Sequence, residues 1–310
     1  MIEEKTLPRR SMQPDEIRHY NNEIVYQLSR FLTDAPRALR IRDIRKIHEE
    51  CDVSMDFAFA TVLASLIGLQ IEGRDRDFFR NYYLPMIHAL DARQFRRNSY
   101  YQKIRIPEKT IGQCALTKKI IEPAEGFVCG DFKVTSDGRL IPSLGFFDAS
   151  FIYPAVLERS REWMTLMPNE TITTDPCAKQ AFGHVLTFGL GLGYFVFKAL
   201  ENEQVRDVTV VELNRDVISL FEQEILPQFP NRDRVRIICA DALEFVQSEN
   251  LMKQYDYLFA DIWHDVGDGR ELYLKIKSYE DRYPSVKFTY WIEDTIKCYL
   301  EPKLWPEQPR

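Results

Sequence analysis

Apolar positions in the second half of the chain alternate between short continuous runs and helical spacing. The runs that predict buried strands are Val185–Phe188, Val208–Leu213, Val235–Ala240, Tyr255–Ile262 and Val286–Ile292. Helical patterns between them begin near Tyr194, Arg215, Leu243 and Arg270. Because alternating strands and helices join through right-handed crossovers, this half predicts a Rossmann-like, doubly wound, mostly parallel α/β sheet with helices on both faces.

The first hundred residues have a different, helical pattern. Apolar side chains recur at three- and four-residue steps at Ile17, Tyr20, Ile24 and Leu28, and the helical texture continues to Arg97. The longest nearly apolar run, Phe57 to Ile71, contains Thr61 and Ser65 and falls short of the roughly 20 residues that span a bilayer. It therefore predicts a buried helix and no membrane span.

Short alternating runs between Cys114 and Phe151, with a turn at Ser136–Gly138, predict a small antiparallel sheet. A helix is expected from about Pro154 to Met167, closed by Pro168. A chain of 310 residues exceeds what one ordinary core needs. We expect a helical N-terminal domain over 1–110, a small β region with a connecting helix over 111–170, and a Rossmann-like nucleoside-binding catalytic domain over 171–310.

Charge is unevenly distributed along the chain. Residues 1–110 carry 19 Lys and Arg against 16 Asp and Glu, whereas residues 111–310 carry 22 against 31. Nucleic-acid binding is normally driven by clustered basic residues, so an acidic second part argues against a nucleic-acid partner. The N-terminus lacks the features of a secretory signal and the six cysteines form no Cys-x-x-Cys pair, so we expect a cytoplasmic protein without a metal site or disulfide framework.

The first candidate site is a glycine-rich turn between a strand and a helix. Gly189, Gly191 and Gly193 follow the strand that ends at Phe188, and a helix begins at Tyr194. Glycines let a ligand approach the backbone, and the N–H groups at the helix start can receive its polar groups. A glycine turn alone is weak evidence, because any tight strand-to-helix turn can use one.

Acids at the ends of the next two strands strengthen the ligand interpretation. Glu212 lies nineteen residues after Gly193, near the offset of about 20 at which an acid accepts hydrogen bonds from a ribose. Asp241, followed by Ala242, is placed to accept a hydrogen bond from an adenine amino group. The alternative is that Glu212 and Asp241 merely cap the helices that follow them.

This set of residues resembles the class I S-adenosylmethionine-dependent methyltransferase superfamily over about residues 180–293. The resemblance implies a cofactor site for S-adenosylmethionine, with Gly189, Gly191 and Gly193 as the glycine loop, Glu212 at the ribose, and Asp241 with Ala242 at the adenine. Many members carry an acid two residues before the first glycine, where this chain has Thr187. Dinucleotide-binding dehydrogenases match less well, because their last glycine falls where this chain has Tyr194.

A looser resemblance is to the spermidine synthase branch, the polyamine aminopropyltransferases. It depends on Asp137-Gly138 in a hairpin and on Phe151-Ile152-Tyr153 before the nucleotide domain, and it implies Tyr153 as a substrate contact. That branch usually has an Asp in its glycine loop, where this chain has Leu192. It also follows its fourth strand with Asp-Ser-x-Asp-Pro, whereas this chain has Asp-Ile-Trp-His-Asp.

The segment after the fourth strand carries the candidate catalytic residues. Asp261, His264 and Asp265 could remove a proton from an acceptor, and Trp263 could stack on a cationic or amine group. The alternative is a solvated acidic loop with an idle His264, because the Gly267-Asp-Gly269 turn attracts acids in any case.

The sheet is expected to be shortened at its C-terminal edge, because little chain follows Ile292. Either the N-terminal region or a partner subunit, as in a homodimer, would cover that edge. The function that these features favour is methyl transfer from S-adenosylmethionine to a small, amine-containing acceptor. Aminopropyl transfer and a non-catalytic S-adenosylmethionine-binding module are the alternatives.

Overall fold

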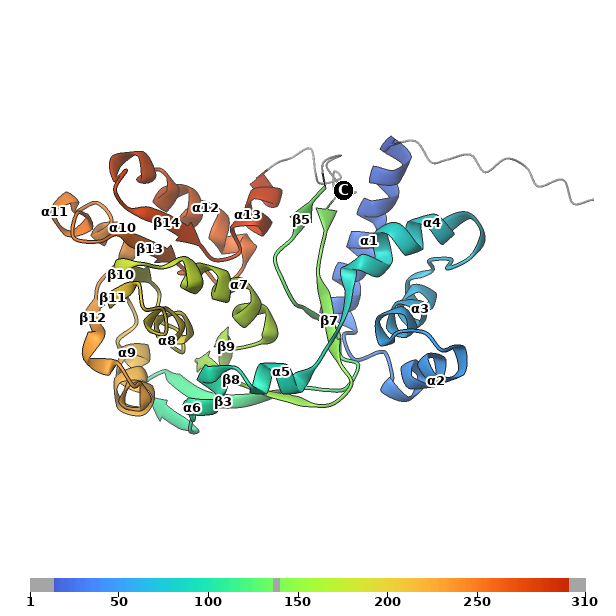
Figure 1. Cartoon of the computed structure of the whole chain (residues 1–310), viewed down its shortest axis with the longest axis horizontal. Coiled ribbons are helices and arrows are strands. Elements are labelled where there is room, and N and C mark those ends of the chain that lie inside the picture. The colour runs from blue at the N-terminus through green and yellow to red at the C-terminus, as the bar shows by residue number, and fades with distance from the viewer. Residues whose placement is uncertain (1–13, 136–139, 301–310) are drawn as a thin grey trace, which may run out of the picture.

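The structure is a computed structural model that describes residues 14–135 and 140–300. Two bodies lie side by side, with the helices α1 to α4 in one and the sheet of strands β10 to β14 in the other (Figure 1). Strands of the intervening region, among them β3, β7 and β8, run between the two bodies. No helix of the described residues is long and apolar enough to cross a membrane.

Helices dominate the first hundred residues, of which α1 to α4 form the N-terminal body and α5 and α6 lie beside β3 and β8 (Figure 1). They are α1 (Pro14–Asp34), α2 (Ile41–Cys51), α3 (Met55–Ile67), α4 (Arg76–Phe78), α5 (Ala92–Arg96) and α6 (Ser99–Lys103), with short helical turns η1 (Gly73–Asp75), η2 (Phe79–Tyr83) and η3 (Leu84–Met86). The buried helix expected near 57–71 is α3. Ser54 caps its start by accepting a hydrogen bond from the Phe57 N–H, and Gly68 ends it with a φ of 78°.

Antiparallel strands make up most of the β region. One sheet has the order β2 (Lys109–Ile111), β3 (Cys114–Ile121), β8 (Phe151–Glu158) and β9 (Arg161–Thr165). A second joins β1 (Ile87–Leu90), β7 (Leu144–Phe147) and β4 (Phe127–Val128), with β1 and β7 parallel, and β5 (Lys133–Val134) pairs with β6 (Leu140–Ile141). The small antiparallel sheet is thus confirmed. The turn expected at Ser136–Gly138, including Asp137, lies outside the described residues.

The expected helix over Pro154–Met167 is wrong, because this segment forms the hairpin of β8 and β9. The two residues between the strands, Arg159 and Ser160, both have positive φ, at 50° and 66°. Two successive residues of positive φ make the tight turn that suits the twist of a hairpin, although neither residue is the Asn or Gly that normally announces it. Pro168 begins a helix, α7 (Pro168–Gln180), rather than ending one.

A parallel sheet forms the second body, with the strand order β12-β11-β10-β13-β14. The strands are β10 (Gly183–Phe188), β11 (Val205–Glu212), β12 (Val235–Cys239), β13 (Tyr257–Ala260) and β14 (Lys287–Tyr290). The helices are α7, α8 (Tyr194–Leu200), α9 (Arg215–Leu220), α10 (Ala242–Phe245), α11 (Glu249–Met252), α12 (Val266–Lys277) and α13 (Glu293–Leu300), with turns η4 (Phe221–Ile225), η5 (Leu226–Gln228), η6 (Arg232–Arg234) and η7 (Glu280–Arg282). The parallel, Rossmann-like sheet expected from the sequence is confirmed.

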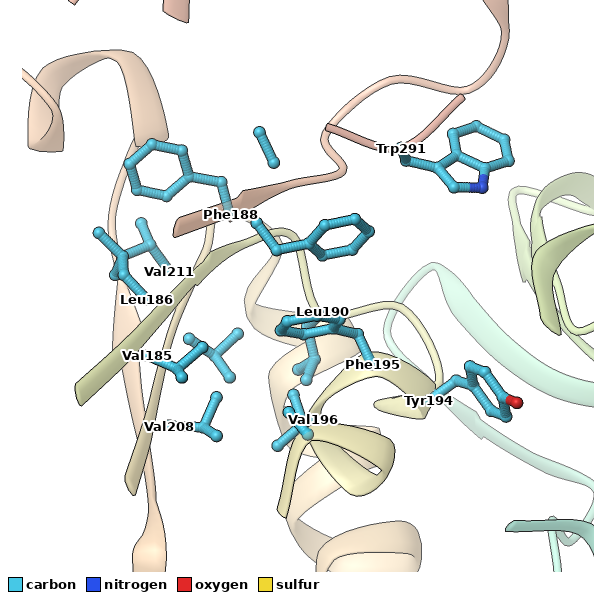
Figure 2. Packing of buried hydrophobic residues seen from close by; sticks show 14 of the residues in the cluster. Val185, Leu186, Phe188, Leu190, Tyr194, Phe195, Val196, Val208, Val211 and Trp291 are labelled. Carbon is cyan, nitrogen blue, oxygen red and sulfur yellow. The ribbon is translucent and has the colours of Figure 1, made fainter. Parts of the chain in front are cut away.

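Apolar side chains on both faces of the sheet hold this body together. Val185, Leu186 and Phe188 of β10 belong to this core (Figure 2). Phe188 packs edge-on against Phe245 of α10, and Phe195 of α8 stacks on Phe259 of β13 at 4.2 Å. Burial on both faces explains why the strands read as continuous apolar runs.

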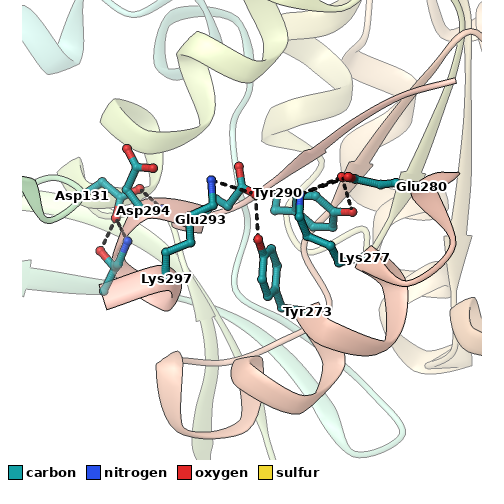
Figure 3. A network of polar contacts seen from close by, with 9 residues as sticks. Asp131, Tyr273, Lys277, Glu280, Tyr290, Glu293, Asp294 and Lys297 are labelled. Carbon is teal, nitrogen blue, oxygen red and sulfur yellow. Dashed lines mark hydrogen bonds and ion pairs between the residues drawn. The ribbon is translucent and has the colours of Figure 1, made fainter. Parts of the chain in front are cut away.

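Within the described residues β14 is the last strand of the sheet, in agreement with the prediction that the sheet is shortened at this edge. The helix that follows, α13, is capped by a residue of the β region. Asp131 accepts hydrogen bonds from the N–H groups of Asp294 (3.2 Å) and Thr295 (2.7 Å) (Figure 3). The N-terminal part of the chain therefore fastens the last helix of the Rossmann-like body.

Candidate active site

A cavity of about 360 Å³ opens at the C-terminal ends of the parallel strands. The strand order places the residues that follow each strand in a row along this edge, with Asp241 after β12, Glu212 at the end of β11, Gly189 after β10, Asp261 after β13 and Trp291 after β14. Ligands of open α/β sheets bind at this edge, where the strand order reverses. The cavity has the size of a small-molecule site, which typically measures about 300–1,000 Å³.

Gly189 and Gly193 occupy backbone conformations that other residues rarely adopt, with φ of 94° and 72°. A Cβ atom at Gly189 would overlap the Asp261 carbonyl oxygen, and one at Gly193 would overlap the Phe221 ring. The glycine turn is therefore required by its contacts with the neighbouring strand and helix. Gly189 and Gly191 line the cavity, whereas Gly193 begins α8 outside it.

Glu212 ties the glycine turn to the end of its own strand. Its carboxylate accepts one hydrogen bond from the Leu190 N–H (3.1 Å) and one from the Asn214 N–H (2.8 Å). Burial raises the pKa of Glu212, and these two N–H donors oppose the rise. The cap of α9 is Asn214, so Glu212 is not the helix cap that the alternative interpretation assumed.

Asp241 does cap the helix that follows it. Its Oδ1 accepts from the N–H groups of Leu243 (2.6 Å) and Glu244 (3.2 Å) at the start of α10. Asp241 and Ala242 also line the cavity. The capping interpretation therefore applies to Asp241, and it leaves the second carboxylate oxygen for a ligand.

Asp261, Trp263 and His264 line the other end of the cavity. The ring of Trp163, on β9, stacks on the His264 ring at 6.0 Å with an interplanar angle of 16°. His264 Nδ1 lies 3.0 Å from the Trp163 carbonyl oxygen, which orients the ring by accepting a hydrogen bond from an Nδ1–H. Such a contact leaves Nε2 as the nitrogen that can accept a proton.

Asp265 and Tyr153 lie outside the cavity lining. Asp265 caps α12 and forms a capping box with Asp268. Tyr153 packs in the hydrophobic cluster of the β region, where burial raises its pKa to about 12. Leu192, at the position of the Asp that the spermidine synthase branch usually carries, is fully buried, and its carbonyl accepts a hydrogen bond from the Tyr100 hydroxyl (2.5 Å).

Sequence reasoning missed several cavity residues, of which Glu170 is the most informative. Glu170 lies in the first turn of α7 and faces the cavity with Asp261. Burial and the negative charge of Asp261 raise the pKa of Glu170 well above its usual range. The signal was present as Pro168-Asn-Glu170, a proline and an acid at a helix start. The wrong prediction of a helix over Pro154–Met167 made Pro168 the end of a helix, so Glu170 was not recognised at a helix start.

Three tryptophans also meet at the cavity: Trp163, Trp263 and Trp291. Trp291 donates its indole N–H to Thr173 of α7 (2.8 Å). The segment that carries it is flanked by a polar network in which Glu293 accepts from Tyr273 (2.8 Å) and pairs with Lys277 (3.3 Å) (Figure 3). The network joins α12 to the start of α13 and so fixes the loop that presents Trp291.

The electrostatic character of the cavity is acidic. The carboxylates that line it are Glu162, Glu170, Glu212, Asp241 and Asp261. Among the residues that the structure describes, no lysine or arginine lines it. Glu162 alone of these acids has a nearby cation, the Lys119 ammonium at 2.5 Å. This lining favours a cationic ligand and disfavours an anionic one.

The solved structures described next resemble the chain at low structural similarity. No protein-family model and no curated protein matches the chain. Among solved structures, spermidine synthase from Thermotoga maritima aligns at 16% identity over 44% of this chain and 48% of its own, with a TM-score of 0.31. A spermidine synthase in complex with the transition-state analogue AdoDATO aligns at 18% identity over the same shares, also with a TM-score of 0.31.

A third structure, the precorrin 8W decarboxylase of Methanobacterium thermoautotrophicum, aligns at 20% identity over 37% of this chain and 56% of its own, with a TM-score of 0.27. The chain thus spans about half the length of the structures it matches. Similarity at these TM-scores carries no information about a shared function. The chemistry of the cavity is the basis for a functional proposal.

Proposed function

We propose that the protein is an S-adenosylmethionine-dependent methyltransferase that acts on a small amine. The observation that carries the proposal is the acidic cavity, in which a glycine turn, Glu212 and Asp241 meet at one end, and Asp261 and His264 at the other. A sulfonium nucleoside and an amine are both cations, and the described lining offers only carboxylates and one histidine as titratable groups. Both substrates therefore match the charge of the site.

The donor end fits the nucleoside in its chemistry. Both oxygens of Glu212 already accept backbone N–H groups, but each carboxylate oxygen has a second lone pair that can accept a ribose hydroxyl. The second carboxylate oxygen of Asp241 can accept a hydrogen bond from the amino group of an adenine. S-adenosylmethionine would supply the electrophilic methyl group when bound there.

The acceptor end supplies the groups that orient an amine and take its proton. His264, oriented by the Trp163 carbonyl, presents Nε2 as one proton acceptor. Asp261 is the other, since burial and the nearby charge of Glu212 raise its pKa to about 7. A base with a pKa near the working pH suits general base catalysis.

Aminopropyl transfer is the second candidate, favoured by one specific observation. The methyl donor carries an α-carboxylate, and no lysine or arginine of the described lining would neutralise it. The decarboxylated donor lacks this group. Leu192 argues the other way, because a buried leucine stands where an aspartate would face the aminopropyl amine.

Calorimetric titration of the purified protein tests the proposal. We expect S-adenosylmethionine and S-adenosylhomocysteine to bind, and Glu212→Gln to weaken both. Tighter binding of the decarboxylated nucleoside would favour aminopropyl transfer instead. If a nucleoside binds but no amine is turned over, the protein is a non-catalytic binding module. If none of these nucleosides binds, the proposed nucleoside site is wrong.

A further inference from the structure

Glu170 and Asp261 stand apart from the other acids of the cavity. Glu170 comes from α7 and Asp261 from the end of β13, and both line the cavity. Among the described residues, neither carboxylate has a hydrogen-bond or ion-pair partner, whereas Glu162 has Lys119, and Glu212 and Asp241 have backbone N–H groups. Both residues are half-buried at the cavity wall, where a carboxylate without a partner is less well solvated than in water, so a cation that binds there can stabilise the pair.

Among the residues that the structure describes, no lysine or arginine lines the cavity beside the pair. Asp261 feels the negative charge of Glu212 from β11, and Glu170 feels that of Asp261. Tyr101 of α6 and Cys177 of α7 lie within electrostatic reach and are neutral at physiological pH, because burial raises the pKa of each. His264, Glu162 and Asp241 complete the titratable lining. Burial and neighbouring negative charge both favour the protonated forms of these two acids.

Aromatic groups at the same cavity point to a ligand. Trp263 is only 5% exposed, and within the described residues its indole Nε1 has no hydrogen-bond acceptor. An unpartnered buried donor is rare in folded proteins, and a ligand or a water held with it can satisfy it. Trp163 and Trp291 add ring faces, which attract cations.

We propose that Glu170 and Asp261 form a carboxyl pair that shares one proton. When a protonated amine binds, the pair releases this proton to solvent and holds the ammonium in its place. This inference deepens the proposed function and rests on it for the identity of the acceptor class. Glu170 is then a substrate-binding residue at the acceptor end, opposite the end where Glu212 and Asp241 lie.

The proton balance of the exchange is simple. The amine enters as an alkylammonium, and the proton held by the pair leaves for solvent, so that two carboxylates face one cation. An N–H bond of the ammonium then breaks and an O–H bond forms on the pair. The nitrogen keeps its electron pair and becomes a neutral nucleophile. No oxidant, reductant or metal is needed.

Calorimetry with butylammonium as the probe tests the exchange. The titration is done near pH 7 in two buffers of different ionisation enthalpy, with and without saturating S-adenosylhomocysteine. The difference between the buffers gives the number of protons released for each amine bound. We expect wild-type protein to release between about half a proton and one proton, as for a group that titrates near the working pH.

Glu170→Gln should release less than half as many protons and bind butylammonium at least about tenfold more weakly, the loss expected for a charge-assisted contact. Asp261→Asn should also release fewer protons for each butylammonium bound. This second variant provides the same test if Glu170→Gln folds poorly. Glu271→Gln is the matched control. Glu271 is an exposed residue of α12 outside the cavity lining, so loss of its charge should leave the proton release unchanged.

The inference is overturned if wild-type protein binds no butylammonium, or if Glu170→Gln binds it and releases protons as wild type does. These outcomes are separate from failure of the proposed function. A protein that does not bind S-adenosylhomocysteine but still releases a proton to solvent when butylammonium binds would support the carboxyl pair and contradict the methyltransferase proposal.

Discussion

The two ends of the cavity hold their carboxylates in opposite ways. At the donor end, Glu212 and Asp241 accept backbone N–H groups from the glycine turn and from helix starts. At the acceptor end, Glu170 and Asp261 have no such donors among the described residues. The donor end is therefore preorganised for a neutral ribose and adenine, whereas the acceptor end stores an electrostatic cost that a cation can remove. Under the proposed function, this difference places the nucleoside at the first end and the amine at the second.

Gly189→Ala should break both ends together and have the largest effect. Its Cβ would overlap the Asp261 carbonyl oxygen, and its φ of 94° is unfavourable for alanine. We expect a loss of about 3 kcal/mol or more in the free energy of unfolding, measured by denaturant titration, and no detectable binding of S-adenosylhomocysteine.

Gly68→Ala is the control for this substitution, because Gly68 has a similar φ of 78° but no atom within 4 Å of an added Cβ. It should cost only about 1–2 kcal/mol, from the backbone conformation, and leave ligand binding intact. Equal losses in the two variants would mean that the contact between the turn and Asp261 is unimportant.

Glu212→Gln should weaken the donor end selectively. A glutamine offers one acceptor oxygen for the two N–H groups of Leu190 and Asn214, and it removes the charge. We expect S-adenosylhomocysteine to bind about 10- to 100-fold more weakly, corresponding to about 1.5–3 kcal/mol for a hydrogen bond to a charged group. The affinity for butylammonium should change much less.

Asp241→Asn sharpens the same comparison, because asparagine also caps helices well and should preserve α10. We expect unchanged stability by denaturant titration and a smaller loss of nucleoside affinity than in Glu212→Gln. A larger loss would make Asp241 the principal donor contact.

The acceptor end should make stability depend on pH. In the folded protein Asp261 has a pKa raised to about 7, whereas the unfolded chain loses this proton near pH 4. The folded state therefore binds more protons between these values, and the free energy of unfolding should fall as the pH rises through this window.

Between pH 5 and pH 7.5 we expect a fall on the order of 2–3 kcal/mol in wild-type protein, since about two units of this interval lie below the folded pKa and each corresponds to about 1.4 kcal/mol. The dependence should be smaller in Asp261→Asn. Denaturant titrations at pH 5 and pH 7.5 measure it, and butylammonium should reduce it. A stability that rises over this range in wild type and variant alike would contradict the account of the pair.

The donor end could be predicted from the sequence, because its features are local. Strand-to-helix turns with positive φ favour glycine, and Gly189, Gly191 and Gly193 occupy the three positive-φ positions of this turn. Glu212 and Asp241 follow apolar strands whose carboxyl ends must share one edge of a parallel sheet. The structure was needed to show that Asp241 caps the helix that follows it and Glu212 does not, since a ligand contact and a cap use the same residue type.

Much of the acceptor end could not be predicted, because it depends on a hairpin without a turn signature. Arg159 and Ser160 take positive φ in the turn, although neither residue favours it. Without that hairpin, Trp163 is not placed on a strand beside His264, and Glu170 is not placed at a helix start. Asp261 was found because it follows a parallel strand, whereas its partner comes from a segment 91 residues earlier in the chain.

Two adjacent tyrosines of α6 offer the finest test of the comparison. The Tyr100 hydroxyl donates to the Leu192 carbonyl (2.5 Å), in the glycine turn of the donor end. The Tyr101 hydroxyl donates to the Leu166 carbonyl, just before the helix that carries Glu170. Each hydroxyl therefore supports the backbone of a different end.

Tyr100→Phe should weaken S-adenosylhomocysteine binding about two- to fivefold, because one buried neutral hydrogen bond is worth about 0.5–1.5 kcal/mol and only part of that reaches the ligand. Butylammonium binding should stay within error. Tyr101→Phe should show the reverse pattern, and each variant serves as the control for the other. If both variants weaken both ligands equally, α6 supports the cavity as one unit, and the two ends are not held independently.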